Sequence, residues 1–109
     1  MALIFPETDI LKILTNRKSM TCRNYPLKVG HDYKLMSNFK IFATVTITNV
    51  TYIEDVNKLN HETIKKLGFK TKKEYLNQFY NVSNNNNTRY LIEFEIKTNE
   101  ILNYIDKWM

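Results

Sequence analysis

The sequence predicts a single α+β domain, and three observations lead to this prediction. The chain has 109 residues, a length that suits one domain with one hydrophobic core. The run from Phe39 to Tyr52 alternates apolar with polar residues, as a half-buried strand does. Residues 60–80 instead carry the capping residues and apolar spacing that are typical of helices. Both kinds of element in one short chain predict a mixed domain.

The N-terminal part of the chain predicts a strand, a short helix and a second strand. The first strand is expected over Ala2–Phe5. The segment Pro6–Asp9 supplies a proline stop and a capping residue, so the helix should run from about Asp9 to Asn16. The second strand is expected near Thr21–Asn24.

The middle of the chain predicts a turn and two longer strands. A turn centred on Gly30 should lead into a strand over His31–Met36, and Ser37-Asn38 should form the next turn. The strand from Phe39 to Tyr52 is the strongest strand prediction in the chain. Its alternation places Val45 and Ile47 on one face and the threonines on the other, namely Thr44, Thr46 and Thr48.

Two helices should follow. Asn60 can cap a helix through Leu67, and Gly68 can end it in the left-handed conformation. Thr71 and Glu74 have the spacing of a capping box, which predicts a second helix over residues 72–80. The apolar stripe of this second helix consists of Tyr75, Leu76 and Phe79.

The C-terminal part predicts a loop, a strand and a last helix. Asn84–Asn87 is a polar loop, and Arg89–Ile96 should be the closing strand. Thr98 should cap a helix whose apolar face consists of Ile101, Leu102, Ile105 and Trp108. We therefore expect one domain over residues 1–97 and a helical extension, residues 98–109, packed on it. An exposed Trp108 would instead mark a dimer contact.

The composition excludes several kinds of protein. Cys22 is the single cysteine and is expected to be a small core or strand residue, so no internal disulfide can form. His31 and His61 do not have zinc-ligand spacing, and no metal or cofactor is expected. No apolar run approaches a membrane span, and no signal peptide precedes the first strand, which predicts a cytoplasmic protein. The net charge of +5 suits an anionic partner as well as ordinary solubility.

The stretch Asn16–Arg23 holds the strongest functional signal. Strand alternation places Thr21 and Arg23 on one face and turns Met20 and Cys22 to the other. Lys18 lies just before this strand, and its long stem can fold back toward the threonine hydroxyl. The result would be a small cationic pocket with one potential nucleophile. The alternative is a set of solvated surface charges near a helix end.

This stretch resembles the signature of the ASCH domain, a branch of the PUA-like superfamily, which reads Gly-x-Lys-x-x-Thr-x-Arg. Lys18, Thr21 and Arg23 match its three polar positions. Asn16 stands at the glycine, and asparagine tolerates left-handed backbone angles. The likeness covers roughly residues 2–97, because further matches follow in the family order at Val29–Asp32, Ala43–Val50, Leu67–Phe69 and Leu91–Ile96.

The resemblance implies a small twisted β-barrel of five or six strands with flanking helices, and a cleft associated with RNA or modified nucleosides. Some small bacterial members hydrolyse the acetyl amide of N4-acetylcytidine with the signature lysine and threonine, which are Lys18 and Thr21 here, and a later glutamate. A lysine whose pKa is lowered by burial or by a neighbouring cation can activate the threonine, and here Arg23 is close by.

The position that corresponds to the family glutamate holds Leu67 in this sequence. The loss of one general acid typically slows a reaction by about 10² to 10⁴. Three other carboxylates are candidates to replace it from elsewhere in the fold, namely Glu62, Glu93 and Glu95.

The same pocket can bind a ligand without catalysis. Lys18 and Arg23 would hold a phosphate or a base edge, and Tyr25 would offer a stacking face. A basic run that could follow a backbone, or could simply be a solvated helix face, consists of Lys65, Lys66, Lys70, Lys72 and Lys73. We predict first a module that binds RNA or a modified nucleoside. A nucleoside amidohydrolase is the second prediction, and a small protein-binding regulator, as monomer or homodimer, is the third.

Overall fold

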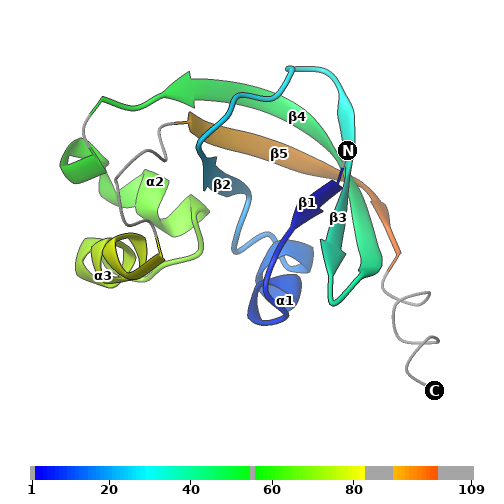
Figure 1. Ribbon diagram of the computed structural model, residues 1–109, viewed down its shortest axis with the longest axis horizontal. Helices are drawn as coiled ribbons and strands as arrows, with labels where there is room; N and C mark the ends of the chain where they lie inside the picture. Colours follow the sequence, from blue (N-terminus) through cyan, green and yellow to red (C-terminus); the bar gives the residue numbers. More distant parts are fainter. Residues whose placement is uncertain (1, 55, 83–89, 101–109) are drawn as a thin grey trace.

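A five-stranded, strongly curled sheet forms the framework of the protein (Figure 1). The computed structural model describes residues 2–54, 56–82 and 90–100. The strands are β1 (Ala2–Ile4), β2 (Met20–Arg23), β3 (Asp32–Ser37), β4 (Lys40–Tyr52) and β5 (Tyr90–Asn99). Their order in the sheet is β1-β3-β4-β5-β2, with β1 and β3 parallel and every other pair antiparallel. This arrangement confirms the predicted α+β fold with a small twisted barrel.

Irregular register explains much of the curl. The pairing of β3 with β4 shifts between Leu35 and Met36. The pairing of β4 with β5 shifts twice, between Thr44 and Val45 and again after Ile47. Bulges of this kind bend a strand and increase its local twist. The long β4 strand can therefore curve over the whole length of the molecule.

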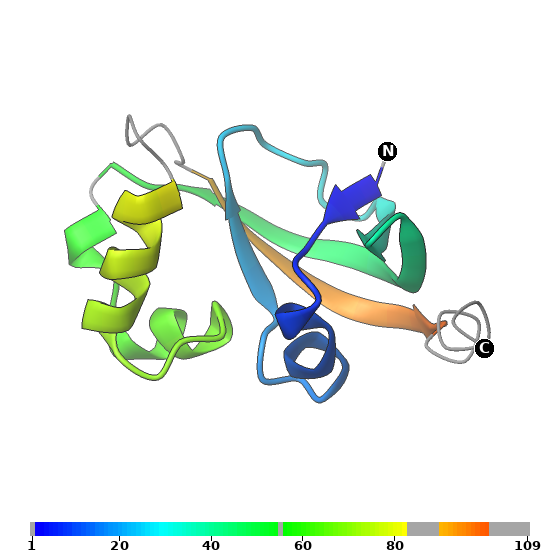
Figure 2. The same ribbon diagram turned by 60° about the horizontal axis from the view of Figure 1, so that its bottom comes forward.

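The helices cover the two sides of β2. They are α1 (Thr8–Leu14), α2 (His61–Lys66) and α3 (Lys72–Val82), and a short 3₁₀ helix spans Val56–Lys58. In Figure 2, α1 lies on one side of β2, and α2 and α3 lie together on the other. β1, α1 and β2 come first in the sequence. They lie around the same opening of the curled sheet as α2 and α3 do.

The buried apolar residues form two clusters. The larger one lies between α1 and the sheet, and its members include Ile13, Phe42 and Ile92. The smaller one lies under α2 and α3, around Ile64 and Leu67. The alternation predicted for β4 is confirmed, because the inward side chains of Val45 and Ile47 are completely or almost completely buried.

The helix ends predicted from capping residues are confirmed for α2 and α3. The capping residue predicted at the start of α1 is wrong, because α1 begins at Thr8 and its N-cap residue, Glu7, makes no side-chain capping hydrogen bond. The side chain of Asn60 accepts a hydrogen bond from the backbone N–H of Thr63 at 2.8 Å and caps α2. Gly68 has a φ of +94° just after that helix. The hydroxyl of Thr71 accepts from the backbone N–H of Glu74 at 3.1 Å at the start of α3.

Two strand boundaries differ from the prediction. The turn between β3 and β4 lies at Asn38-Phe39, so Ser37 belongs to β3, and Phe39 belongs to the turn. β5 continues to Asn99, and Thr98 pairs with Thr44 in the sheet. The prediction that Thr98 caps a helix is therefore wrong. The rest of that predicted helix and the polar loop Asn84–Asn87 lie outside the described residues.

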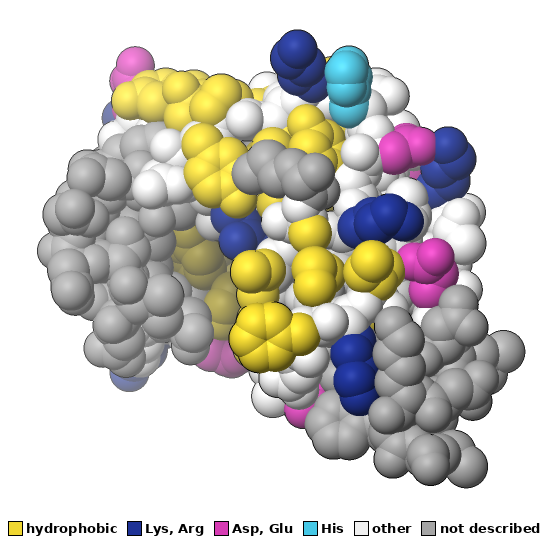
Figure 3. Space-filling model, turned by 45° about the vertical axis from the view of Figure 1, so that its right-hand side comes forward, with side chains coloured by type: hydrophobic (Ala, Val, Ile, Leu, Met, Phe, Trp, Pro, Cys, Tyr) yellow, Lys and Arg dark blue, Asp and Glu magenta, His cyan; other side chains and the backbone are white. Residues whose placement is uncertain are grey.

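An apolar groove lies beside the β3–β4 hairpin. Apolar side chains gather on the side of the molecule that carries β1 and this hairpin (Figure 3). A hollow of about 410 Å³ there is lined by Ile4, Phe5, Pro6, Met36, Asn38 and Phe39. Ile4 is 70% exposed and Phe39 is 98% exposed.

Among the helices of the described segments, none has the length and apolarity that a membrane span requires.

Candidate functional site

The signature segment bends at Asn16 and then enters β2. Asn16 has a φ of +61°, the left-handed conformation that was expected where the ASCH signature has glycine. In β2, the Nε of Arg23 donates to the hydroxyl of Thr21 at 3.2 Å, so these two side chains share a face as predicted. Met20 and Cys22 pack on the other face, against the smaller apolar cluster.

The ammonium group of Lys18 lies inside the protein. The side chain is only 7% exposed, and Nζ donates to the carbonyl of Leu67 at 2.6 Å. Nζ also lies 5.9 Å from the centre of the Phe69 ring. Burial lowers the pKa of Lys18 to about 8, while the charge of Asp9 raises the pKa and that of Arg23 lowers it further. The Lys18 amine therefore loses its proton at a much lower pH than an ordinary lysine does.

Three consecutive carbonyls at the end of α2 receive hydrogen bonds from α1 and from the segment that links α1 to β2. The backbone N–H of Ser19 donates to Lys66 at 2.9 Å, Lys18 donates to Leu67, and Nζ of Lys12 donates to Gly68 at 3.2 Å. The last carbonyls of a helix have no partner within the helix, and lysine side chains can satisfy them. The signature lysine thus helps to fix the junction of α2 and α3.

The backbone conformation at this junction explains Gly68. Its φ is positive, which favours glycine. A Cβ atom built on Gly68 would lie 3.4 Å from three carbons of the Lys18 stem, which is van der Waals contact. The lysine stem and the glycine backbone therefore lie against each other.

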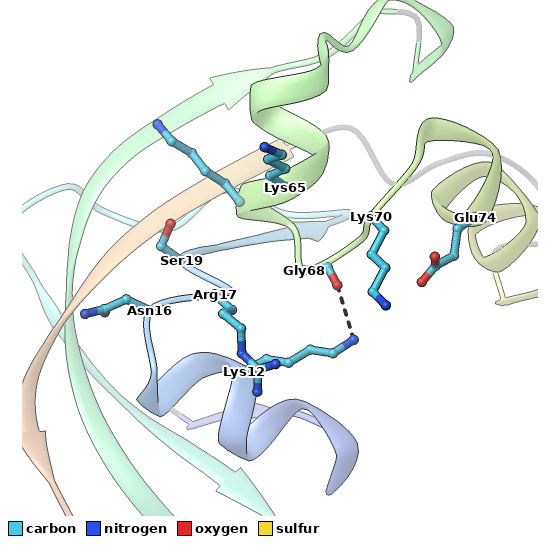
Figure 4. Close-up of a pocket in the computed structure, with 9 residues that line it drawn as sticks. Lys12, Asn16, Arg17, Ser19, Lys65, Gly68, Lys70 and Glu74 are labelled. Atoms are coloured by element: carbon cyan, nitrogen blue, oxygen red, sulfur yellow. Dashed lines mark hydrogen bonds between the residues drawn. The ribbon is translucent and has the colours of Figure 1, made fainter.

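A pocket of about 480 Å³ opens between the two segments that these hydrogen bonds join (Figure 4). One wall comes from the end of α1 and the following turn, and the other comes from α2, the junction and the start of α3. The pocket is lined by Lys12, Asn16, Arg17, Ser19, Lys65, Lys66, Gly68, Lys70 and Glu74. Five of these nine residues are cationic and one is acidic, so the pocket is electropositive.

The cations of this pocket differ in how they are bound. Lys66 forms an ion pair with Glu93 at 3.1 Å and a longer one with Glu62 at 3.9 Å. The Nε of Arg17 donates to the hydroxyl of Thr15 at 3.0 Å. Lys65 and Lys70 are exposed, and neither forms an ion pair with a carboxylate of the described residues. These two ammonium groups are the ones most open to a ligand.

Figure 4 shows how the groups around the junction lie. The ammonium groups of Lys12 and Lys70 point toward the same side of the Gly68 carbonyl. The carboxylate of Glu74 lies on the far side of Lys70, on the first turn of α3. The pocket thus presents positive charge near its middle and one acceptor group toward α3.

Several predicted site residues lie elsewhere. The guanidinium of Arg23 donates through Nη2 to the carbonyl of Ile4 at 3.0 Å and lies 4.9 Å from the centre of the Phe5 ring. Tyr25 is half-buried against the larger apolar cluster. Lys72 donates to the carbonyl of Asn57. None of these residues lines the pocket, and neither does the exposed Lys73.

Of the predicted basic run, the structure brings Lys65, Lys66 and Lys70 into the pocket. The sequence interpretation missed the contributions of Lys12, Arg17 and Glu74. A signal existed for two of them, because Arg17 lies inside the signature stretch and Glu74 belongs to the predicted capping box. Lys12 carried no such signal, since its partner carbonyl is 56 residues away in the sequence.

The carboxylates proposed as substitutes for a catalytic acid do not gather around Lys18. Glu93 is paired with Lys66, and Glu62 and Glu95 are exposed. Within the ranges that the structure describes, no carboxylate forms an ion pair with Lys18. Leu67, at the position of the family glutamate, is buried and offers only its backbone carbonyl to that lysine. The same described ranges contain no group of acidic, histidine or cysteine side chains that could hold a metal ion.

Comparison with known proteins identifies this architecture. No family model and no curated protein matches the chain. The hypothetical protein PH0355 has a similar structure, with a TM-score of 0.68 and 18% identity over 88% of this chain and 99% of that chain. The ASCH domain from Lactobacillus crispatus JV V101 matches with a TM-score of 0.63 and 16% identity over 82% of this chain and 70% of that chain. 

A DUF984 protein from Enterococcus faecalis V583 is also similar, with a TM-score of 0.61 and 15% identity over 83% of this chain and 70% of that chain. At these identities the likeness shows the fold alone. The chain has the fold of an ASCH domain, as the resemblance of its Asn16–Arg23 stretch implies.

Proposed function

We propose that this protein is an RNA-binding module that holds a phosphate of its ligand in the pocket between α1 and the α2–α3 junction. The observation that carries the proposal is the excess of positive charge around one hollow, where five cations face a single carboxylate. Lysine ammonium groups form strong, charge-assisted hydrogen bonds with phosphate oxygens. A volume of about 480 Å³ is also in the range of sites that hold small ligands.

The fixed walls of the pocket support this proposal. The three hydrogen bonds to the carbonyls of Lys66, Leu67 and Gly68 hold the two walls together without a ligand. A preformed site loses less conformational entropy on binding than a flexible one does. Because Lys65 and Lys70 have no ion pair to break among the described residues, a phosphate can engage them directly.

The first prediction concerns the salt dependence of binding. Replacing Lys65 and Lys70 together by Ala should weaken binding of a short single-stranded RNA by about tenfold to a hundredfold. For single strands, log affinity falls with log salt by about 0.7 per phosphate neutralised, so the slope should decrease in magnitude by about 1.4. Fluorescence anisotropy with a labelled RNA at several salt concentrations measures both quantities.

A matched control uses the Lys28→Ala/Lys34→Ala double variant. Both lysines are exposed and neither lines the pocket, so the variant loses the same charge elsewhere. Its affinity and slope should stay close to those of the wild type. Equal effects of the two double variants would show that net charge, and not this pocket, determines binding.

A second candidate function, an amidohydrolase acting on N4-acetylcytidine, is favoured by one observation. The pKa of Lys18 is lowered to about 8, which allows a lysine to act as a base at moderate pH. The buried hydroxyl of Thr21 would be the nucleophile, and Arg23 orients it through a hydrogen bond. Because Leu67 replaces the family glutamate, the expected rate is low.

The second prediction tests this reaction through the release of acetate. Wild-type protein should release acetate slowly from N4-acetylcytidine, and the Lys18→Ala and Thr21→Ala variants should release none above background. The Lys28→Ala variant, which changes an exposed lysine outside the pocket, should behave as the wild type. The absence of any release by wild-type protein would exclude the amidohydrolase.

A further inference from the structure

The pocket combines its cations with one carboxylate, and this combination bears on what it selects. Glu74 is the single acidic residue among the nine that line the pocket. In Figure 4 its carboxylate lies beside the Lys70 side chain and points toward it. Among the described residues, no lysine or arginine lies close enough to Glu74 to form an ion pair. Its oxygens are therefore acceptors that a ligand can use.

Glu74 lies at a defined place in the fold. It is on the first turn of α3, and its backbone N–H donates to the Thr71 hydroxyl. α3 has 11 residues, and the positive end of the helix dipole attracts a carboxylate on the first turn. A glutamate carboxylate is a hydrogen-bond acceptor.

An anionic acceptor inside a phosphate-binding pocket discriminates between ligands. It repels a second phosphate, so it is unsuited to a site that only follows an RNA backbone. It attracts groups that present N–H donors, and a carboxylate pairs best with two parallel donors. Among the four bases, guanine alone presents two adjacent donors, N1–H and N2–H₂, on its Watson–Crick edge. Uracil presents one N–H between two carbonyl oxygens that would repel the carboxylate.

We infer that the pocket selects a guanine nucleotide, with the phosphate near Lys12 and Lys70 and the Watson–Crick edge of the base on Glu74. This inference rests on the proposed function, because it assigns a base to the ligand whose phosphate the pocket holds. Glu74 is the specificity-determining residue, and the lysines supply affinity that does not depend on the base. An unpaired guanine in RNA and free guanosine monophosphate present the same chemistry.

The third prediction compares two short RNAs, an oligouridine and the same oligouridine with one central guanine. Wild-type protein should bind the guanine-containing RNA about tenfold more tightly, the discrimination typical of a good bidentate contact. In the Glu74→Gln variant, binding of oligouridine should strengthen a few-fold, because a negative charge near the phosphates is removed. The preference for guanine should disappear in that variant, since a carboxamide has one acceptor oxygen and its NH₂ donors would face the second N–H donor of the base edge.

The outcomes separate base selection from the proposed function. If neither RNA binds, the phosphate pocket itself is refuted. If both bind equally to the wild type and the Lys65/Lys70 variant still weakens them, the pocket stands and guanine selection is refuted. If Glu74→Gln strengthens both RNAs by one factor and the preference survives, Glu74 acts only through its charge and the inference is overturned.

Two further arms complete the experiment. Glu54→Gln removes the same charge from an exposed position outside the pocket, and it should leave the preference unchanged. Guanosine monophosphate and uridine monophosphate are each used to displace the labelled RNA. This comparison tests whether the pocket recognises a free guanine nucleotide. Preferential competition by the guanine nucleotide supports guanine recognition in the pocket. Equal competition by the two nucleotides would overturn guanine selection for the free nucleotide. The two RNAs decide whether the pocket selects an unpaired guanine in RNA.

Discussion

At the scale of single residues, Lys18 has a pKa near 8 mainly because it is buried. The sequence left two causes open for a lowered pKa, namely burial and the nearby charge of Arg23. The Arg23 charge does lower the pKa, but its effect is smaller than that of burial, and Asp9 opposes it. The stretch Asn16–Arg23 alone could not decide between the two causes, because the groups that cover Lys18 come from Leu67 and Phe69.

The fourth prediction follows from this pKa. An unfolded chain has an ordinary lysine pKa of 10.5, so between about pH 8 and 10.5 the unfolded state binds more protons than the folded state. Raising the pH therefore favours the folded state over this range. Relative to a Lys18→Met variant, the free energy of unfolding of wild-type protein should rise by about 2 to 3 kcal/mol between pH 7 and pH 10.

Urea denaturation of both proteins at several pH values measures this difference. Comparison with Lys18→Met removes the contribution of tyrosines and other lysines that titrate in the same range. A Lys28→Met variant serves as the control, since this exposed lysine should give a difference that does not change with pH. A pH-independent difference for Lys18→Met would contradict the burial of a titrating amine.

Asn16 and Leu67 show the two limits of prediction from single residues. The left-handed backbone at Asn16 was predictable, because it depends on that residue and its immediate neighbours. At Leu67 the sequence predicts only that a carboxylate is missing. Leu67 contributes to the site through its backbone carbonyl, which accepts a hydrogen bond from the Lys18 ammonium. A comparison of side chains does not reveal that bond.

At the scale of elements, the β3–β4 hairpin contains an unusual turn. Asn38 has a φ of +52° and Phe39 has a φ of +65°. Positive φ at both central residues is the requirement of a type I′ turn, for which Asn-Gly is the favoured pair. Phenylalanine tolerates this conformation poorly, and here its side chain is 98% exposed. The turn therefore holds local strain that no burial of the ring offsets.

The fifth prediction is that Phe39→Gly stabilises the protein by about 0.5 to 1 kcal/mol. Glycine removes the strain at positive φ. The free energy gained in this way exceeds the free energy lost because glycine has more conformational entropy in the unfolded chain. Thermal or urea denaturation of the isolated protein measures the change. Phe39→Ala removes the same ring and keeps the Cβ atom, so it should leave stability nearly unchanged. A loss of stability in Phe39→Gly would mean that the ring makes a contact that stabilises the fold.

The ends of α2 and α3 were easier to predict than the strand ends. Asn60, Gly68 and Thr71 act through backbone groups a few residues away, so their roles could be inferred from spacing alone. The end of β5 could not be inferred in this way. Residues at the end of that strand are polar, and they belong to the sheet because Thr98 and Asn99 pair with the bulged start of β4.

At the scale of the whole molecule, the pocket was the feature least accessible from sequence. One of its walls comes from residues 12–19 and the other from residues 65–74. The basic character of the second wall was visible as a run of lysines, with Lys65 and Lys66 among them. The first wall, the depth of the hollow and the position of Glu74 depend on how the two segments meet. The fold itself was predictable because a short signature and the order of the elements agreed.

The two edge strands of the curled sheet lie close enough for one side chain to join them. β1 and β2 are the edge strands, and Arg23 donates from β2 to the carbonyl of Ile4 at the end of β1. This contact lies across the gap where a closed barrel would have a further row of backbone hydrogen bonds. The sheet is thus an open barrel whose edges are linked by a guanidinium group.

The position of β2 also has a consequence for the order of folding. β2 is complete at residue 23, yet its strand partner is β5, which begins at residue 90. During synthesis, the segment with Lys18, Thr21 and Arg23 must wait for nearly seventy further residues before it can join the sheet. Contacts so distant in sequence slow folding, since the intervening chain must first be ordered. The strand that carries Thr21 and Arg23 is therefore made well before the strand with which it pairs.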